Sequence, residues 1–265
     1  MNPPIPASLT KHLSILHHPL PQDASILLPI RQVSSTSSSN GEGTGTTGTT
    51  LWSSAQVLSA YLAATLPSGM GKKVIELGSG TGYASLVLAS LGWEVTATDI
   101  EPVLSSVLSH NVTVCKRVLL QHGLPAEIKV GMIDWEQYAS GVSEEAMEVG
   151  TKRWDIIVMT DTLYASHLID PLWKTLIRLS SNTIRPPSLS LEQDKSERGA
   201  ASPIYFALES RDPAMIAQAL DRGRALGFEL KKVGGRVGKT LRKWGWDKND
   251  WEGVEIWKGR YKAQS

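Results

Sequence analysis

The chain has 265 residues, of which 41% are hydrophobic and 20% charged, so it is long enough for one substantial domain with an ordinary core, or for such a domain with a small appendage. Its formal net charge of +1 does not predict a strongly anionic partner such as DNA. The single cysteine, Cys115, excludes an intramolecular disulfide and favours a reducing compartment.

The chain shows neither a leader-like N-terminus nor a run long and apolar enough to span a membrane. We therefore expect a soluble intracellular protein, located in the cytoplasm, with the nucleus as an additional possibility. Cys115 lies in a helical stretch, where a buried small residue is a better interpretation than a nucleophile.

The first 50 residues are interpreted as an N-terminal extension. Residues 26–30 predict a short strand that its prolines stop or place at an edge. Residues 33–50 are nearly all Ser, Thr, Gly and Asn, a composition that cannot bury apolar surface and predicts flexibility at least to about residue 45. The main domain is accordingly placed at residues 51–265.

From Leu51 onward, helical and strand patterns alternate. Apolar residues from Trp52 to Leu66 recur at helical spacing, and Pro67 ends that helix. We predict further helices at 83–91, 101–120, 168–179 and 213–226, and strands at 73–77, 94–98, 127–130, 154–159, 204–208, 228–233 and 254–257. The polar segment 181–202 predicts a surface loop. This order predicts an α/β, Rossmann-like, mostly parallel seven-stranded sheet with helices on both faces and an antiparallel C-terminal hairpin.

The strand at 73–77 runs into a glycine loop, Gly78-Ser79-Gly80-Thr81-Gly82, which is followed by a helix. Glycines let the backbone approach a ligand, and the helix N-terminus presents free N–H groups to it. The dinucleotide pattern G-x-G-x-x-G requires a third glycine where this chain has Tyr83. The loop is therefore better suited to S-adenosylmethionine, with a simple tight turn as the alternative interpretation.

Two carboxylates accompany the loop. Glu76, two positions before the first glycine, is placed to meet the ammonium of the methionine moiety directly or through water. Asp99 ends the next strand, where a carboxylate accepts hydrogen bonds from ribose hydroxyls, and Glu101 is the fallback for that role.

The segment from Leu51 to Leu62, the residues Glu76 to Gly82 and the tetrad Asp161-Thr162-Leu163-Tyr164 resemble the METTL-type seven-β-strand protein-lysine methyltransferases, often grouped as methyltransferase family sixteen. The resemblance covers about residues 50–260. The chain departs from this family in its low-complexity region before Trp52 and in its long loop at 181–202.

The resemblance implies a role for each matching position. Trp52 would lie against the cofactor, which Glu76, Gly78, Ser79 and Gly80 would cradle and whose ribose Asp99 would hold. The adenine would be bordered by Asp134 and Trp135, and the acceptor amine would face Asp161 and Tyr164. Structural alternatives stay open: Trp52 as a core residue, Asp134 as a turn residue, Asp161 as a helix cap and Tyr164 as a packing residue.

Two further features allow a functional and a structural interpretation. Arg211 could grip an acidic protein segment, whereas Asp212 before Pro213 predicts a helix cap. The basic stretch Arg236, Lys239, Arg242 and Lys243, with Trp244 and Trp246, could bind single-stranded nucleic acid, but we expect a solvated loop between the last two strands. The histidines lack metal-ligand spacing of the H-E-x-x-H kind, so no metal is expected.

These observations predict a protein-lysine methyltransferase that uses S-adenosylmethionine and acts as a monomer on a protein substrate, with no membrane and no nucleic-acid partner. One alternative is methylation of a small molecule, such as a nicotinamide-like amine, or of nucleic acid. Another is a non-catalytic cofactor-binding assembly factor. The nucleic-acid version expects an N-P-P-Y-like tetrad where this chain has Asp161 to Tyr164, and loss of Glu76 or Asp161 would have favoured the non-catalytic version.

Overall fold

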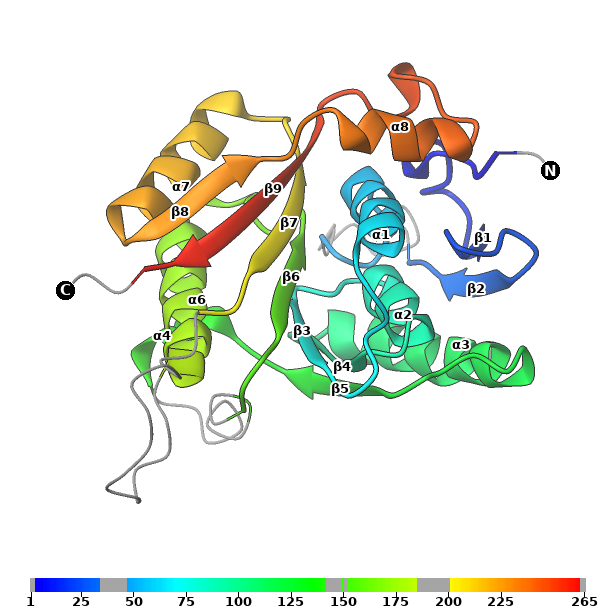
Figure 1. Cartoon of the computed structure of the whole chain (residues 1–265), viewed down its shortest axis with the longest axis horizontal. Helices are drawn as coiled ribbons and strands as arrows, with labels where there is room; N and C mark the ends of the chain where they lie inside the picture. Colours follow the sequence, from blue (N-terminus) through cyan, green and yellow to red (C-terminus); the bar gives the residue numbers. More distant parts are fainter. Residues whose placement is uncertain (1–2, 34–46, 142–148, 150–151, 185–200, 263–265) are drawn as a thin grey trace, which may run out of the picture.

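The computed structural model describes residues 3–33, 47–141, 149, 152–184 and 201–262, with the backbone alone for 181–184 (Figure 1). At its centre lies a seven-stranded sheet in the order β5-β4-β3-β6-β7-β9-β8. Neighbouring strands from β5 to β7 in this order are parallel, and β9 is antiparallel to both β7 and β8. This confirms the predicted mostly parallel sheet with antiparallel strands at its C-terminal edge. The strands are β3 (Lys73–Leu77), β4 (Glu94–Asp99), β5 (Ile128–Met132), β6 (Ile156–Thr160), β7 (Ile204–Glu209), β8 (Phe228–Lys232) and β9 (Val254–Tyr261).

Helices cover both faces of the sheet (Figure 1). One face carries α1 (Ser53–Thr65), α2 (Tyr83–Ser90) and α3 (Ser109–Gln121), and the other carries α4 (Trp135–Ser140), α6 (Ile169–Ile184) and α7 (Pro213–Ala225). Successive strand residues point to opposite faces, so Val74 joins the core under α1 to α3 while Ile75 and Leu77 join the other core. Glu76, between them, therefore points to the α1–α3 side.

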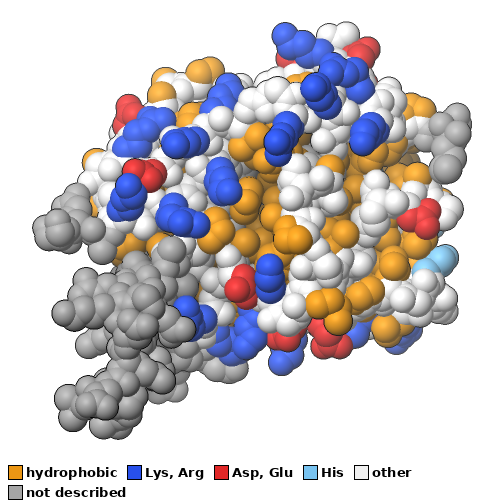
Figure 2. Space-filling view, viewed as in Figure 1, with side chains coloured by type: hydrophobic (Ala, Val, Ile, Leu, Met, Phe, Trp, Pro, Cys, Tyr) orange, Lys and Arg blue, Asp and Glu red, His pale blue; other side chains and the backbone are white. Residues whose placement is uncertain are grey.

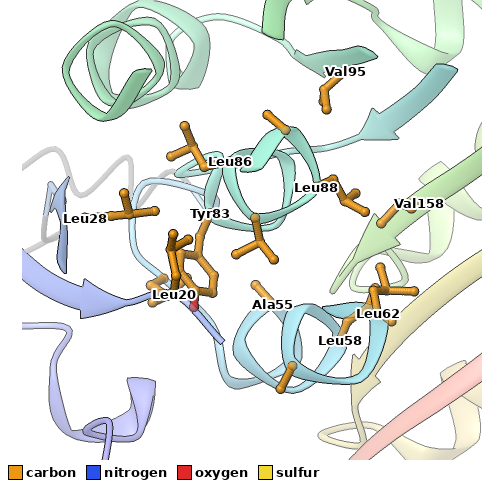
Figure 3. Close-up of a cluster of buried hydrophobic side chains, with 14 of the residues drawn as sticks. Leu20, Leu28, Ala55, Leu58, Leu62, Tyr83, Leu86, Leu88, Val95 and Val158 are labelled. Atoms are coloured by element: carbon orange, nitrogen blue, oxygen red, sulfur yellow. The ribbon is translucent and has the colours of Figure 1, made fainter. Parts of the chain in front are cut away.

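The helix after the glycine loop is anchored by Tyr83, which stands where a dinucleotide fold has its third glycine. Its ring is 1% exposed, and its hydroxyl donates a 2.8 Å hydrogen bond to the carbonyl of Pro19. Figure 3 shows this side chain reaching from α2 toward Leu20 within the apolar cluster that α1 and α2 share. A bulky residue at this position thus fastens the loop's helix to the N-terminal part of the chain.

A small antiparallel sheet precedes the main one. It pairs β1 (Ile15–Pro19) with β2 (Leu27–Arg31), and β2 corresponds to the strand predicted at 26–30. No strand was predicted at β1, whose sequence contains two histidines and a proline. Its inward side chains, Leu16 and His18, are nevertheless buried, as are Leu28 and Ile30 of β2. The hairpin packs its apolar side against the domain rather than standing free of it.

Of the segment expected to be flexible, 33–50, the structure describes Val33 and residues 47–50. Residues 34–46 lie outside the described residues. Residues 47–50 are placed, and Thr49 is 5% exposed, with its hydroxyl donating to the carbonyl of Val33 at 2.7 Å. Thr49, which the composition placed in the flexible segment, is therefore buried and hydrogen-bonded to Val33.

The basic, aromatic stretch after β8 is not the solvated loop that we expected. It forms helix α8 (Arg236–Lys243), in which Val237 and Leu241 are buried. After the helix, Trp246 is 2% exposed and donates its indole N–H to the carbonyl of Pro4. Val237 and Leu241 are four residues apart and form the apolar inner face of α8. This face was not recognised from the sequence because many cations surround the two apolar residues. The cations point outward, and Figure 2 shows Lys and Arg side chains gathered over this end of the molecule.

Three smaller differences concern helix ends. The helix predicted at 101–120 begins as a π-helix, η3 (Leu104–Leu108), before α3. α6 continues to Ile184, into the polar segment predicted as a loop, and residues 185–200 of that segment lie outside the described residues. Among the described helices, none combines the length and apolar character needed to cross a membrane.

Candidate functional site

A pocket opens at the carboxyl ends of β3, β4 and β6, the edge where open α/β sheets bind ligands. Its lining includes every residue that the sequence predicted for the site except Glu76. These are Trp52, Gly78, Ser79, Gly80, Asp99, Asp134, Trp135, Asp161 and Tyr164. The parallel order of the strands is what brings these distant positions together.

The glycine loop needs its glycines for two separate reasons. Gly78, Gly80 and Gly82 have φ values of +64°, +54° and +80°, a backbone region that strongly favours glycine. A Cβ atom on Gly80 would also lie 2.9 Å from the carbonyl oxygen of Gly48. The loop therefore packs backbone against backbone, and residue 48, in the low-complexity segment, forms part of the site.

Hydrogen bonds hold this loop on the end of β4. The amide of Ser79 donates to the carbonyl of Thr98 at 2.8 Å, and the amide of Thr98 donates to the Ser79 hydroxyl at 3.0 Å. The Thr98 hydroxyl donates to the carbonyl of Glu76 at 2.7 Å. The loop is thereby fixed before any ligand arrives, which lowers the entropic cost of binding one.

Glu76 lies beneath the loop and does not line the pocket. Its side chain is fully buried, and its Oε2 accepts a 2.5 Å hydrogen bond from the Ser85 hydroxyl. Its Oε1 is buried without a hydrogen-bond partner among the described residues. Burial raises the pKa of Glu76 to about 7, although the hydrogen bonds from Ser85 and Ser79 act against this rise. An unsatisfied carboxylate oxygen at this depth suits a water molecule or a cationic group above it.

Asp99 stands at the end of β4 and faces the pocket. Its Oδ2 accepts a 2.8 Å hydrogen bond from the amide of Gly80, and its Oδ1 accepts one of 2.9 Å from the amide of Ile100. Burial raises the pKa of Asp99 to about 6, and both amide bonds oppose that rise. The residue therefore fixes the loop and still presents a carboxylate at the position predicted for the ribose.

Asp134 and Trp135 have a structural role and also line the pocket. Asp134 is the N-cap of α4, because its Oδ1 accepts from the amides of Glu136 at 2.8 Å and Gln137 at 3.2 Å. The indole of Trp135 lies against Gly78, since a Cβ there would be 3.1 Å from its Cζ2. The cap thus positions a flat aromatic surface beside the loop, as a bound adenine would require.

Asp161, at the end of β6, has a backbone conformation that is rare outside glycine, and both oxygens of its carboxylate accept hydrogen bonds. Its φ of +52° is the only positive value at a non-glycine residue in the described chain. Its Oδ1 accepts from the amide of Glu209 at 2.8 Å, and its Oδ2 accepts from the Ser54 hydroxyl at 2.5 Å and from Arg211 at 3.3 Å. Burial raises its pKa, which these hydrogen bonds and the Arg211 charge oppose. Asp161 caps no helix, because the next one begins after Ala165.

Two aromatic side chains line the same pocket as Asp161. Trp52 is the N-cap residue of α1 and is half-buried with its ring in the pocket lining, so it is not a plain core residue. The Arg211 guanidinium lies 4.0 Å from the centroid of that ring, and the Nζ of Lys11 lies 3.4 Å from it. Tyr164 is 44% exposed at the rim.

Other residues at the site were missed from the sequence or interpreted differently. Ser54 and Lys11 carry no motif that marks them, and Glu209 is identified only by its place at the end of β7. Arg211 holds Asp161 and Glu209, at 3.3 Å and 3.0 Å, instead of standing free for a partner. The predicted cap on α7 is confirmed, since Asp212 accepts from the amide of Met215 at 3.0 Å.

Taken by their chemistry, these residues fit S-adenosylmethionine. The glycine loop leaves room for a close backbone approach, and Asp99 offers a carboxylate for ribose hydroxyls. The orphaned Oε1 of Glu76 lies beneath the loop, and the rings of Trp52 and Trp135 provide the apolar, π-rich walls that an adenine or a sulfonium prefers. Cys115, by contrast, is buried away from this pocket, and burial raises its pKa to about 12.

Comparison with known proteins adds the family. A family model described as lysine methyltransferase matches residues 35–198, more than half of the chain. The chain is 32% identical over 149 residues to protein N-lysine methyltransferase METTL21A of Danio rerio, an alignment that covers 56% of this chain and 63% of that protein. It is 31% identical over 175 residues to protein-lysine N-methyltransferase EFM3 of Chaetomium thermophilum, covering 64% of this chain and 48% of that protein. The alignments thus span less than two thirds of the length of these curated relatives.

Proposed function

Since this chain belongs to the lysine methyltransferase family, we propose that it transfers methyl groups from S-adenosylmethionine to the side-chain amine of a lysine in a protein substrate. One observation of the structure carries this proposal. A single pocket brings the glycine loop and Asp99 together with Trp52, Asp161 and Tyr164. This grouping supports a site for the cofactor beside a site for an amine at one edge of the sheet.

The bound cofactor supplies an electrophilic methyl group on a sulfonium. The residues around it have to hold the acceptor in line with that group and keep water away. Asp161 is suited to the first task, because a 2.5 Å hydrogen bond from Ser54 and a 2.8 Å bond from the amide of Glu209 fix its carboxylate. The rings of Trp52 and Tyr164 are suited to the second, since they line the same pocket.

The acceptor lysine must lose a proton before it attacks, because its unperturbed pKa is about 10.4. A carboxylate favours the charged amine, so Asp161 acts by capturing and orienting the ammonium rather than by removing its proton. Entry into the half-buried pocket lowers the pKa of the amine, and water takes the proton. Arg211 now holds the Oδ2 of Asp161 at 3.3 Å, and we propose that the substrate ammonium displaces it or binds beside it.

The test is to incubate the full chain with isotopically labelled S-adenosylmethionine and a cell lysate, and then to locate the label. Label on lysine residues of a defined protein is the expected result. Label confined to the small-molecule or nucleic-acid fraction would overturn the proposal. An N-methyltransferase of small amines is the second candidate, and this experiment separates it from the first.

A further inference from the structure

The side-chain amine of Lys11 lies next to the candidate active site, although Lys11 is not itself among the residues that line the pocket. Its Nζ is 3.4 Å from the centroid of the Trp52 ring, and Trp52 lines the cofactor pocket. Among the described residues, two other lysines lie over aromatic rings, and both are farther from them. Lys72 is 5.9 Å from the ring of Trp93, and Lys258 is 5.0 Å from that of Tyr205. Neither of those rings lines the pocket.

The charged groups that act on this amine include those of the proposed acceptor site. Asp161 and Glu209 are close enough to attract its charge, and Arg211, which lies 4.0 Å from the same Trp52 ring, repels it. Among the described residues, the Lys11 Nζ makes neither a hydrogen bond nor an ion pair, so its contact with the Trp52 ring is what holds it. The amine therefore lies over the Trp52 ring, with Asp161 near enough to act on its charge, and no hydrogen bond has to break for it to move.

The backbone that carries Lys11 is firmly held. The amide of Ala7 donates to the Oε1 of Gln56 at 2.8 Å, and the Nε2 of Gln56 donates to the carbonyl of Ile5 at 2.9 Å. The Nε2 of Gln32 donates to the carbonyl of Thr10 at 2.9 Å. Lys11 thus has a fixed Cα position and a long side chain whose amine reaches the Trp52 ring beside the pocket, which gives the amine a high effective concentration near the site.

The state of the amine also favours reaction. Burial lowers the pKa of Lys11, and the charge of Arg211 lowers it further, while Glu209 and Asp161 oppose both effects. The lowered pKa favours the neutral amine relative to a lysine in free solution, whereas the contact with the Trp52 ring favours the charged form. A neutral amine with an unshared electron pair is what methyl transfer requires.

We infer that Lys11 is itself a methyl acceptor, so that the protein methylates its own N-terminal segment within one molecule. This inference rests on the proposed function. The lone pair of the neutral Nζ forms a bond to the methyl carbon, and the carbon–sulfur bond breaks with its electrons left on sulfur. The products are N-methyl-lysine, as an ammonium that exchanges its proton with water, and S-adenosylhomocysteine.

The inference is tested with the purified full chain and labelled S-adenosylmethionine, with no other protein present. Peptide mass spectrometry should locate the label on Lys11 and not on Lys72 or Lys258. The initial rate per molecule should not change on dilution, because the step is intramolecular. Lys11→Arg should abolish the label, and the matched variant Lys72→Arg should leave it unchanged.

A second readout needs no cofactor. Competitive labelling of amines with a trace acylating reagent, repeated across alkaline pH, should give Lys11 a lower apparent pKa than Lys72. Trp52→Ala should return the Lys11 value toward that of a free lysine, because the indole contributes to burying the amine.

The possible outcomes separate this inference from the proposed function. Label on a lysate protein with Lys11 unmodified would overturn self-methylation and leave the proposed function intact. A rate that rises with protein concentration, or methylation of the Asp161→Ala chain by the intact one, would overturn the intramolecular step. A chain that binds the cofactor but labels no protein would overturn both.

Discussion

At the scale of single residues, Glu76 has the largest expected effect on how the site and the fold respond to pH. Its carboxylate is fully buried, with one oxygen held by Ser85 and the other without a partner among the described residues. Burying a charge without full compensation is costly, and this explains why its pKa rises to about 7 from the ordinary value of 4.5. The folded state thus favours the protonated form, whereas a cationic ligand group favours the ionised form.

This conflict gives a pH prediction for Glu76→Gln. Between the unfolded pKa of 4.5 and the folded value of about 7, the folded state binds more protons, so Glu76 lowers the free energy of unfolding as the pH rises. Above pH 7 the variant should be more stable than the parent chain by up to about 3 kcal/mol, and near pH 4.5 the difference should vanish. Urea titrations at several pH values, without cofactor, measure it. An equal difference at all pH values would contradict the assignment.

The same substitution tests the cofactor role predicted for Glu76. If its carboxylate serves the ammonium of the methionine moiety, Glu76→Gln should bind S-adenosylmethionine more weakly while the protein is more stable. Calorimetric titration at pH 8 measures the affinity. Unchanged affinity would restrict Glu76 to a structural role beneath the loop.

Substitutions of Asp99 and Asp161 should separate cofactor binding from methyl transfer. Asp99→Ala removes the predicted ribose acceptor and the partner of the Gly80 amide, so cofactor affinity should fall by about 1–3 kcal/mol. Asp161→Ala leaves the glycine loop intact and should bind cofactor normally but lose methyl transfer. Calorimetry and a labelled transfer assay on each variant measure the two effects. Normal transfer by Asp161→Ala would remove that residue from the acceptor site.

At the scale of elements, two alanine variants can separate the cost of backbone strain from the cost of disturbing the contact between the glycine loop and Gly48. Gly80 and Gly71 both have positive φ values, +54° and +72°, so alanine is strained at either position. At Gly71 nothing lies within 4 Å of the added Cβ, whereas at Gly80 it would lie 2.9 Å from the Gly48 carbonyl oxygen. Gly71→Ala therefore measures backbone strain alone, of about 1 kcal/mol.

Gly80→Ala should cost more stability than Gly71→Ala and should also weaken cofactor binding, because the loop and residues 47–50 must move apart. Chemical denaturation and calorimetric titration compare the two variants directly. Equal losses of stability with unchanged affinity would show that the contact with Gly48 does not shape the pocket.

The elements also show which parts of the fold can be predicted from a sequence pattern. β3, the loop and α2 were predicted within a residue or two, because an apolar run, three glycines and an Ala- and Leu-rich helix follow one another without conflict. β1 and α8 were missed. In β1 only two inward side chains are buried and a proline ends the strand, and in α8 four cations hide a two-residue apolar face. Burial against the rest of the chain stabilises both elements, and local propensity does not reveal it.

The candidate site also divides into features that the sequence pattern predicts and features that depend on contacts between distant residues. Nine of its ten predicted residues line the pocket, because parallel strands place their carboxyl ends at one edge of the sheet. The exception, Glu76, faces the helices beneath the loop, where Ser85 holds it. The contacts of Asp161 with Ser54 and Arg211 join residues 107 and 50 positions apart in sequence, so no motif could have predicted them.

At the scale of the whole molecule, the start of the chain is tied to its other end and to the loop helix. The indole of Trp246 donates to the carbonyl of Pro4, and the hydroxyl of Tyr83 donates to that of Pro19, so the segment after α8 and helix α2 both hold the N-terminal segment (Figure 1). Between them lies His18, 1% exposed, with Nδ1 3.1 Å from the carbonyl of Pro19 and Nε2 2.6 Å from the Nε2 of Gln56. These partners imply that Nδ1 carries the proton and that Nε2 accepts.

His18 should make the stability of the whole fold depend on pH in the direction opposite to Glu76. Burial lowers the pKa of His18 from 6.5 to about 4, so between these values the unfolded chain binds more protons than the folded one. Its contribution is fully present above pH 6.5 and is lost as the pH falls toward 4, by up to about 3 kcal/mol. Between pH 4.5 and 6.5 the slopes from His18 and Glu76 oppose each other, and each hides the other in the parent chain.

Removing one of these two groups should therefore reveal the pH dependence that the other contributes to the free energy of unfolding. In Glu76→Gln, the free energy of unfolding should fall more steeply with acidification below pH 6.5 than in the parent chain. In His18→Gln, which loses packing at every pH, it should instead rise on acidification over that range, because Glu76 and Asp99, whose pKa values are raised to about 7 and about 6, then dominate. Urea titrations of the parent chain, both single variants and the double variant give the four slopes. Parallel pH profiles for all four chains would show that neither buried group governs the acid response.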